Sequence, residues 1–241
     1  MKPKNFDFVA RFYPLLERAA FGNALNEARL AYLASIAASQ RVLLVGEGNG
    51  RFLAALLREK AGGHVTVVDS SGQMLATLRE RIQPIQRRAE LTLVCADFRA
   101  WQPDQEGFDM IVTHFFLDLF RPETQRRLLT KLTALARPGA QWIDVDYAPH
   151  ALTLRTRCID WLQYRFDRLF SGVEADRHYD PASVIGDAGW RVQEEEKHCR
   201  GGVSARLLVL TSIEKLPVPT CQPLVPRMVS AAQPALETEN G

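Results

Sequence analysis

A glycine-rich segment near residue 50 constrains the fold of this chain more than any other feature of its sequence. Residues 46–50 (GEGNG) directly follow a continuous apolar run at 42–45 (VLLV), and residues 52–60 (FLAALLREK) then repeat apolar side chains at helical spacing. A short continuous apolar run is typical of a strand buried on both faces. Glycine lets the backbone turn tightly and lets a ligand approach without a Cβ in the way. The segment therefore predicts a strand–turn–helix unit with a ligand at its turn.

Strand-like and helix-like segments continue to alternate beyond this unit. Further strands are expected at residues 65–68, 91–95, 108–113 and 141–145, and further helices at 73–82 and from Pro122 to the stop at Pro138-Gly139. Two strand-like runs, 190–195 and 205–212, follow one another without a helix and predict a hairpin. We expect an α/β fold: a Rossmann-like, doubly wound, mostly parallel seven-stranded sheet with an antiparallel edge hairpin, helices on both faces and an N-terminal helical cap.

The chain is predicted to have three parts. Residues 1–40 show helical spacing and form the N-terminal cap, and residues 41–213 form the ligand-binding domain. Within that domain, a helix at about residues 151–171 is rich in arginine and aromatic residues and is expected to act as a lid. Residues 214–241 are Pro-rich with little periodicity, and we expect a flexible tail.

Composition argues against several classes of protein. A formal net charge of +2 and a pI near 8.4 are too balanced to predict a nucleic-acid partner. The four cysteines are scattered and form no C-x-x-C pair, which indicates a reducing compartment without a disulfide framework or a zinc knuckle. No apolar segment reaches the roughly 18 residues of a membrane span, and the N-terminus does not read as a signal peptide. We therefore expect a cytoplasmic protein.

Acidic residues follow the next two predicted strands. Asp69 comes about twenty residues after the glycines, where a carboxylate can accept hydrogen bonds from both hydroxyls of a ribose. An Asp at a strand end is also a common helix N-cap, so the nucleoside site is inferred from Asp69 and the glycines together. After the following strand, Asp97 could accept a hydrogen bond from an adenine amino group while Phe98 and Met74 cover the ring. Met74 taken alone is more typical of helix packing.

These segments, in this order, resemble the class I S-adenosylmethionine-dependent methyltransferases. The resemblance spans residues 41–146 and is closest to the broad group that includes the ubiquinone/menaquinone-type enzymes. The segments that carry it are VLLVGEGNGRF, VTVVDSSGQML, LVCADFRAW, FDMIVTHFFLDLF and LARPGAQWIDVDY. The dinucleotide fingerprint G-x-G-x-x-G would instead need glycine at position 51, where this chain has Arg51, which argues against NAD or FAD.

The resemblance implies S-adenosylmethionine as the cofactor, S-adenosylhomocysteine as the product and no need for a metal. In that family the glycine loop faces the methionine part of the cofactor, the acid after the second strand holds the ribose, and the Asp after the third strand reads adenine. The acid that usually precedes the first glycine is Val45 here, with Glu47 inside the loop, which leaves open the acid that contacts the amino-acid end. The cofactor site expected on this basis comprises Gly46, Glu47, Gly48, Gly50, Asp69, Ser70, Met74, Asp97, Phe98 and Thr113.

The segment after the fourth predicted strand supplies the candidate catalytic groups. His114 is a candidate general base because the ordinary pKa of histidine lies near neutrality, and a hydrogen-bonded wall residue is the competing interpretation. Asp118 either orients His114 or caps the following helix. Tyr13 in the cap and Tyr147 after the fifth strand, together with His114, are expected to contact the acceptor. Because the sulfonium is already an activated electrophile, catalysis can come from alignment, with a base needed only to remove a proton.

The acceptor is expected to be a small molecule, including quinone-like or lipid-like ones. A protein or nucleic-acid acceptor is the first alternative, and it is disfavoured by the balanced charge and by the sequence THFF where an N/D-P-P-Y-type motif would stand. A non-catalytic, cofactor-binding regulatory protein is the second alternative, and an NAD enzyme is the third. The sequence leaves the oligomeric state open.

Overall fold

The computed structural model describes residues 23–36, 38–60, 62–85, 88–103, 107–148, 179 and 181–211. The predicted lid helix at 151–171, the tail at 214–241 and most of the cap, including Tyr13, lie outside these ranges, so the division into three parts stays a prediction. Strands run over β1 Arg41–Val45, β2 His64–Asp69, β3 Glu90–Cys95, β4 Phe108–His114, β5 Ala136–Tyr147, β6 Trp190–His198 and β7 Val203–Leu210. Helices run over α2 Ala24–Leu30, α3 Leu33–Ile36, α4 Arg51–Glu59, α5 Gly72–Ile82, η1 Leu117–Leu119, α6 Pro122–Leu135, α8 Ala182–Ile185, η3 Gly186–Ala188 and η4 Cys199–Gly201.

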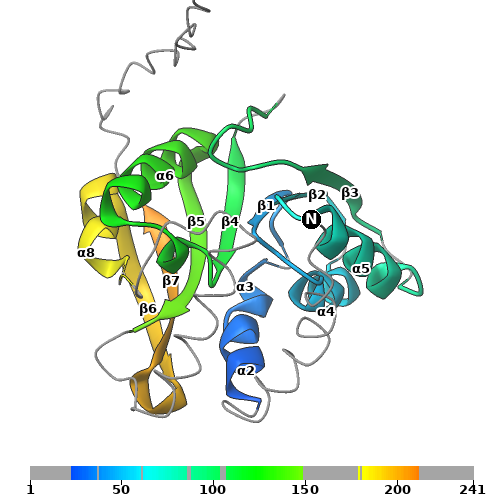
Figure 1. The fold of residues 1–241 in the computed structure, drawn as a ribbon, viewed down its shortest axis with the longest axis horizontal. Coiled ribbons are helices and arrows are strands. Elements are labelled where there is room, and N and C mark those ends of the chain that lie inside the picture. The colour runs from blue at the N-terminus through cyan, green and yellow to red at the C-terminus, as the bar shows by residue number, and fades with distance from the viewer. Residues whose placement is uncertain are drawn as a thin grey trace, which may run out of the picture.

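The strands form one seven-stranded sheet in the order β3-β2-β1-β4-β5-β7-β6 (Figure 1). Strands β1 to β5 are mutually parallel, and β7 is antiparallel to both of its neighbours. The predicted fold, with its antiparallel edge hairpin, is therefore confirmed. The strand order reverses direction between β1 and β4, and ligands of open α/β sheets bind outside the carboxyl ends of the strands at such a point.

Helices cover both faces of the sheet, and each face has its own core. Side chains of α2 to α5 pack against one face around Phe52 and Leu78. Side chains of α6 and α8 pack against the other face around Trp142 and Leu129. In Figure 1 these two groups of helices lie on opposite sides of the sheet. Strands β1 and β4 are buried on both faces, and for β1 the continuous apolar run at residues 42–45 predicts this.

The boundary between α6 and β5 differs from the prediction. The helix ends at Leu135, and Pro138 and Gly139 lie inside β5, near a register shift that carries the β4 pairing from Ala136 to Gln141. Proline disfavours helical geometry in the residue before it, which ends the helix early, and an irregular strand tolerates its missing N–H.

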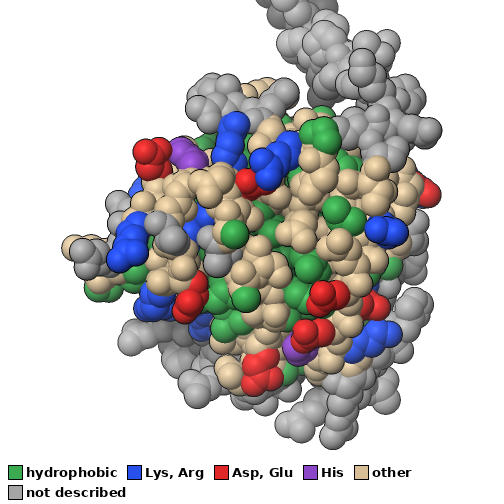
Figure 2. Space-filling view, turned by 180° about the vertical axis from the view of Figure 1, so that it is seen from behind, with side chains coloured by type: hydrophobic (Ala, Val, Ile, Leu, Met, Phe, Trp, Pro, Cys, Tyr) green, Lys and Arg blue, Asp and Glu red, His purple; other side chains and the backbone are tan. Residues whose placement is uncertain are grey.

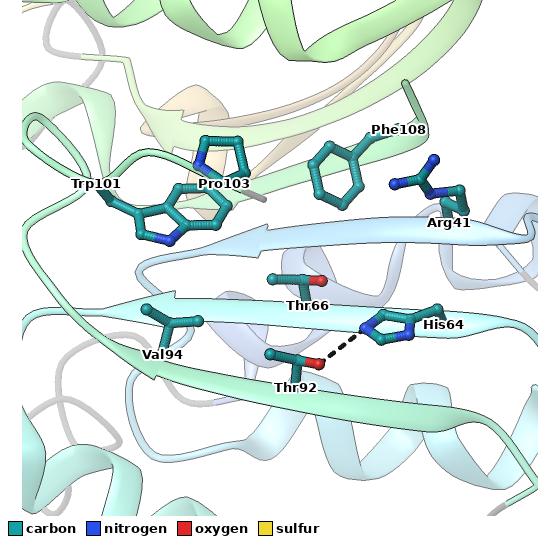
Figure 3. Close-up of a pocket in the computed structure, with 8 residues that line it drawn as sticks. All are labelled: Arg41, His64, Thr66, Thr92, Val94, Trp101, Pro103 and Phe108. Carbon is teal, nitrogen blue, oxygen red and sulfur yellow. Dashed lines mark hydrogen bonds between the residues drawn. The ribbon is translucent and has the colours of Figure 1, made fainter. Parts of the chain in front are cut away.

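The connection between β3 and β4 lacks a helix in its described part, residues 96–103 and 107. A crossover between parallel strands is usually helical, and here the sheet beneath carries a shallow depression instead. Side chains from four strands and from this connection line it: Arg41, His64, Thr66, Thr92, Val94, Trp101, Pro103 and Phe108 (Figure 3).

Replacing Gly50 with alanine tests the packing of the glycine turn. Gly50 has φ +77°, and an added Cβ would lie 2.8 Å from Leu78 Cγ of α5. We expect Gly50→Ala to lower the free energy of unfolding by about 2–5 kcal/mol, the sum of left-handed strain and overpacking. Chemical denaturation measures the change. Gly139→Ala is the matched control, because Gly139 has φ +74° and open space around its Cα; equal losses in the two variants would contradict the packing argument.

Candidate functional site

The glycine turn lies at the carboxyl ends of β1 and β2. Gly46, Gly48 and Gly50 all have positive φ, between 68° and 77°, which favours glycine at each position. The Gly46 amide donates to the carbonyl of Val68 at 2.9 Å, which ties the turn to the end of β2. The turn is thus positioned by two adjacent parallel strands.

Asp69 is the last residue of β2 and lies directly against the glycine turn. Its carboxylate accepts hydrogen bonds from the Gly48 amide and from the Ser71 amide, each at 2.8 Å. Ser70, beside it, is exposed. The structure therefore brings together the turn and the acid that the sequence placed about twenty residues apart. Contact of Asp69 with a ribose stays a prediction.

Asp97 lies in the turn after β3. The Ala96 amide donates to the carbonyl of Asp69 at 3.0 Å, which places this turn beside the end of β2. Both carboxylate oxygens of Asp97 engage Arg99, with the Arg99 Nη2 to Asp97 Oδ2 distance at 2.6 Å. This partner holds the pKa of Asp97 below its ordinary value. The Asp97 side chain is 42% exposed, so a ligand can reach it.

Met74 and Phe98 occupy different environments. The Met74 side chain, on the first turn of α5, is one of the few large apolar side chains exposed to solvent. The interpretation of Met74 as a helix-packing residue is therefore wrong, and its position leaves it open to a ligand near Ser70. Phe98 is buried, with its ring centroid 5.9 Å from that of Trp101 and 6.1 Å from that of Phe116. Coverage of an adenine ring by either residue stays a prediction.

Glu47, inside the glycine turn, lies within electrostatic range of Arg29. Glu47 Oε1 accepts a hydrogen bond from the Leu53 amide at 3.0 Å. Burial raises the pKa of Glu47 to about 7, while the Leu53 amide and the Arg29 charge oppose the shift. Arg29 lies on α2, and its guanidinium is 4.6 Å from the centroid of the Phe115 ring. Sequence reasoning missed Arg29, because a single arginine on an amphipathic helix carries no signal of its own.

The end of β4 directs Thr113 and His114 to opposite faces of the sheet. Thr113 Oγ1 donates to Asp144 Oδ1 at 3.0 Å and accepts from Trp142 Nε1 at 2.9 Å, so its side chain belongs to the α6 core. The His114 ring packs edge-on against Phe52 of α4, with centroids 4.5 Å apart. This alternation is the ordinary geometry of a strand.

The environment of His114 is apolar and lies near a positive charge. Burial, and after it the Arg29 charge, lowers the pKa of His114 to about 3. The imidazole is therefore neutral at pH 7, and the near-neutral pKa expected from the sequence does not hold. Its buried Nε2 has no hydrogen-bond partner among the residues that the structure describes. Such a group is better suited to accept a hydrogen bond than to remove a proton.

Asp118 pairs with Asp146 on the α6 side of the sheet. The two buried carboxyl groups hydrogen-bond to each other, and the Leu117 amide donates to Asp146 Oδ2 at 3.2 Å. Burial, and after it the charges of Asp118 and Asp144, raises the pKa of Asp146 well above its ordinary value. The pair therefore holds a proton. The structure thus gives Asp118 a carboxyl partner on this face, whereas the His114 ring packs against α4.

Tyr147 ends β5 and is buried. Its ring centroid lies 5.0 Å from that of Phe115. Phe115 has φ +52°, a conformation that non-glycine residues adopt rarely and that gathers at functional sites. Tyr13 lies outside the described residues, so of the predicted acceptor contacts His114 and Tyr147 alone can be placed, both at the carboxyl ends of neighbouring strands.

Comparison with known proteins agrees with this geometry. Residues 42–139 match the model of a family described as a methyltransferase domain. No curated protein sequence matches the chain significantly.

Solved structures share the fold at low sequence identity. The N-methyltransferase NodS from Bradyrhizobium japonicum, in complex with S-adenosylhomocysteine, has a TM-score of 0.56 and 15% identity, over 78% of this chain and 84% of its own. Magnesium protoporphyrin IX methyltransferase from Synechocystis PCC 6803, with bound S-adenosylhomocysteine, has a TM-score of 0.58 and 16% identity, over 79% of this chain and 85% of its own. Mitomycin 7-O-methyltransferase has a TM-score of 0.61 and 17% identity, over 86% of this chain and 60% of its own.

The strand order and the glycine–acid contact at the switch point define the class I methyltransferase fold. The match over residues 42–139 covers the first four strands of the sheet and the helices between them, and the solved methyltransferases share the fold of the described chain. Within the described residues, no helix is long and apolar enough to cross a membrane.

Asp69→Ala tests the ribose assignment. We expect the affinity for S-adenosylhomocysteine to fall by about 10- to 100-fold, because hydrogen bonds to a charged group contribute about 1.5–3 kcal/mol. Isothermal titration measures the affinity. Asp109→Ala is the matched control: its carboxylate also accepts two backbone amides, Gln40 N and Arg41 N at 2.9 Å each, but at the opposite edge of the sheet. A variant of Asp69 that keeps full affinity, or a control that loses as much, would overturn the assignment.

The raised pKa of Glu47 predicts that cofactor binding depends on pH. Below its pKa of about 7 the side chain is neutral, and above it we expect the carboxylate to attract the ammonium group of S-adenosylhomocysteine. The affinity for S-adenosylhomocysteine should therefore rise by about tenfold from about pH 6 to about pH 8. Titration with 5′-methylthioadenosine, which lacks the amino-acid end, should show no such rise. Glu47→Gln should remove the rise, and its persistence in that variant would rule out Glu47 as the titrating group.

Proposed function

We propose that the protein is a class I S-adenosylmethionine-dependent methyltransferase and that it methylates a small-molecule acceptor bound beyond the carboxyl ends of β4 and β5. The observation that carries this proposal is the aromatic and cationic corner beside the cofactor loop, where Phe115 contacts both Tyr147 and Arg29. Aromatic rings and a guanidinium together favour a flat or partly anionic molecule. The fold supports the same class of acceptor, since the mitomycin and magnesium protoporphyrin enzymes share it.

The charge distribution supports a small acceptor over a nucleic acid. Basic and acidic side chains are interspersed over the face shown in Figure 2, and the net charge of the whole chain is +2. Nucleic-acid-binding surfaces instead cluster lysine and arginine on one face.

His114 is proposed to align the acceptor. Its unpartnered Nε2 can accept a hydrogen bond from an N–H or O–H of the acceptor when the ring proton is on Nδ1. This contact would orient the nucleophilic atom toward the methyl group for in-line transfer, and the sulfonium supplies the activated electrophile. The neutral imidazole also avoids placing a second positive charge beside the sulfonium.

Transfer of a labelled methyl group tests both proposals. The enzyme is incubated with S-[methyl-³H]-adenosylmethionine and separately with the small-molecule, protein and nucleic-acid fractions of a cell extract. We expect label in products made from the small-molecule fraction. Label on protein or nucleic acid instead would contradict the acceptor class.

His114→Ala should lower transfer by about 10- to 100-fold, as expected for loss of one positioning hydrogen bond, and should leave the affinity for S-adenosylhomocysteine unchanged. His64→Ala is the matched control, since His64 begins β2 at the opposite edge of the sheet and hydrogen-bonds Thr92. That variant should keep both properties. Equal transfer in the two variants would show that His114 does not act on the acceptor.

A further inference from the structure

In its described part, residues 96–103 and 107, the connection that carries Asp97 contains no crossover helix. Its own backbone closes a single turn, in which the Ala100 and Trp101 amides donate to the carbonyl of Asp97 at 3.0 and 2.9 Å. In a longer helix the carbonyls of the following residues would accept from amides one turn further on. Here the described chain continues after Trp101 without helical structure, so these carbonyls need another donor.

Lys131 of α6 supplies that donor. Its Nζ donates to the carbonyl of Phe98 at 2.6 Å, to the carbonyl of Trp101, and to the carbonyl of Arg99 at 3.4 Å. The same ammonium lies 4.9 Å from the centroid of the Phe98 ring. An ammonium group has three donors, and this turn presents three acceptors to it. The three N–H donors of Lys131 are therefore matched by three carbonyl acceptors around its Nζ.

Arg99 acts on Asp97 from within the same turn, two residues away, and its guanidinium also lies 5.6 Å from the centroid of the Phe120 ring. Lys131 instead donates to the carbonyls of the turn. Lys131 belongs to a different element, a helix packed on the sheet through Leu128 and Leu132. Together with the Ala96 amide bonded to Asp69, it ties the turn to the body of the protein.

We propose that Lys131 is a positioning residue for adenine recognition: by holding the carbonyls of Phe98, Arg99 and Trp101, it places the Asp97 carboxylate where the adenine amino group binds. This inference rests on the proposed contact between Asp97 and adenine. The role requires a lysine. The planar guanidinium of arginine cannot converge on three carbonyls from a single atom, and an apolar side chain leaves all three carbonyls without this donor.

Binding of two ligands by the full chain tests the proposal. S-adenosylhomocysteine carries the adenine amino group, and S-inosylhomocysteine carries an oxygen in its place, which cannot donate to Asp97. We expect the wild type to prefer the adenine compound. Lys131→Met should lower the affinity for S-adenosylhomocysteine by about tenfold or more, the loss of one charge-assisted hydrogen bond, and should change the affinity for S-inosylhomocysteine little. The discrimination between the two ligands should fall accordingly.

Further variants separate the possible causes. Lys131→Gln, which retains two N–H donors, should lose less discrimination than Lys131→Met, and it serves as the test if the methionine variant does not fold. Lys60→Met is the control, because Lys60 also donates to a backbone carbonyl, that of Ser39. Ser39 lies just before the amino end of β1, away from the carboxyl ends of the strands. This control should keep the wild-type discrimination.

Two outcomes would overturn the inference. Wild-type discrimination in Lys131→Met would show that the lysine does not position Asp97, and an equal loss of both ligands would show that it supports only the fold. Asp97→Ala, which removes the acceptor, tests the underlying assignment independently. If that variant keeps the wild-type preference for adenine, the contact between Asp97 and adenine is wrong, whatever Lys131 does.

Discussion

The hydrogen bond from the Gly48 amide to the Asp69 carboxylate is the contact on which the proposed cofactor site depends. It joins the end of β1 to the end of β2, and the Ala96 amide extends the connection to the turn after β3. Three consecutive strand ends are therefore fixed relative to one another by backbone groups. A nucleoside that spans them meets a site whose geometry exists before binding, which reduces the entropy cost of ordering the site around the ligand.

Burial controls the charge of the site. Burial raises the pKa values of Glu47 and Asp146 and lowers the pKa of His114. In each case the loss of water around the charged form outweighs the interactions that would stabilise it. Burial therefore leaves His114 uncharged and favours the neutral forms of Glu47 and Asp146. In the proposed function this suits methyl transfer, since the reaction needs alignment at the sulfonium and little proton transfer from the protein.

The turn after β3 is held by a side chain from another element, Lys131 of α6. Without a helix in the described part of the β3–β4 connection, the sheet face beneath it is open (Figure 3). Backbone carbonyls that a helix would satisfy are instead held by Lys131 from α6. A side chain about thirty residues away thus donates the hydrogen bonds that backbone amides of the same helix usually supply.

The sequence by itself determined the strands, the mostly parallel sheet and the glycine turn, because these depend on local patterns: continuous apolar runs such as 42–45, glycines at a strand end and an acid one strand later. The order of the strands came from the structure. The sequence misplaced the start of β5, where Pro138 entered an irregular strand instead of following the helix. Only the tertiary structure decided the exposure of Met74, the neutral state of His114, the pairing of Asp118 with Asp146 and the approach of Arg29 and Lys131. Those properties depend on which side chains surround a group and how much water they remove, and elements far apart in the chain supply these neighbours.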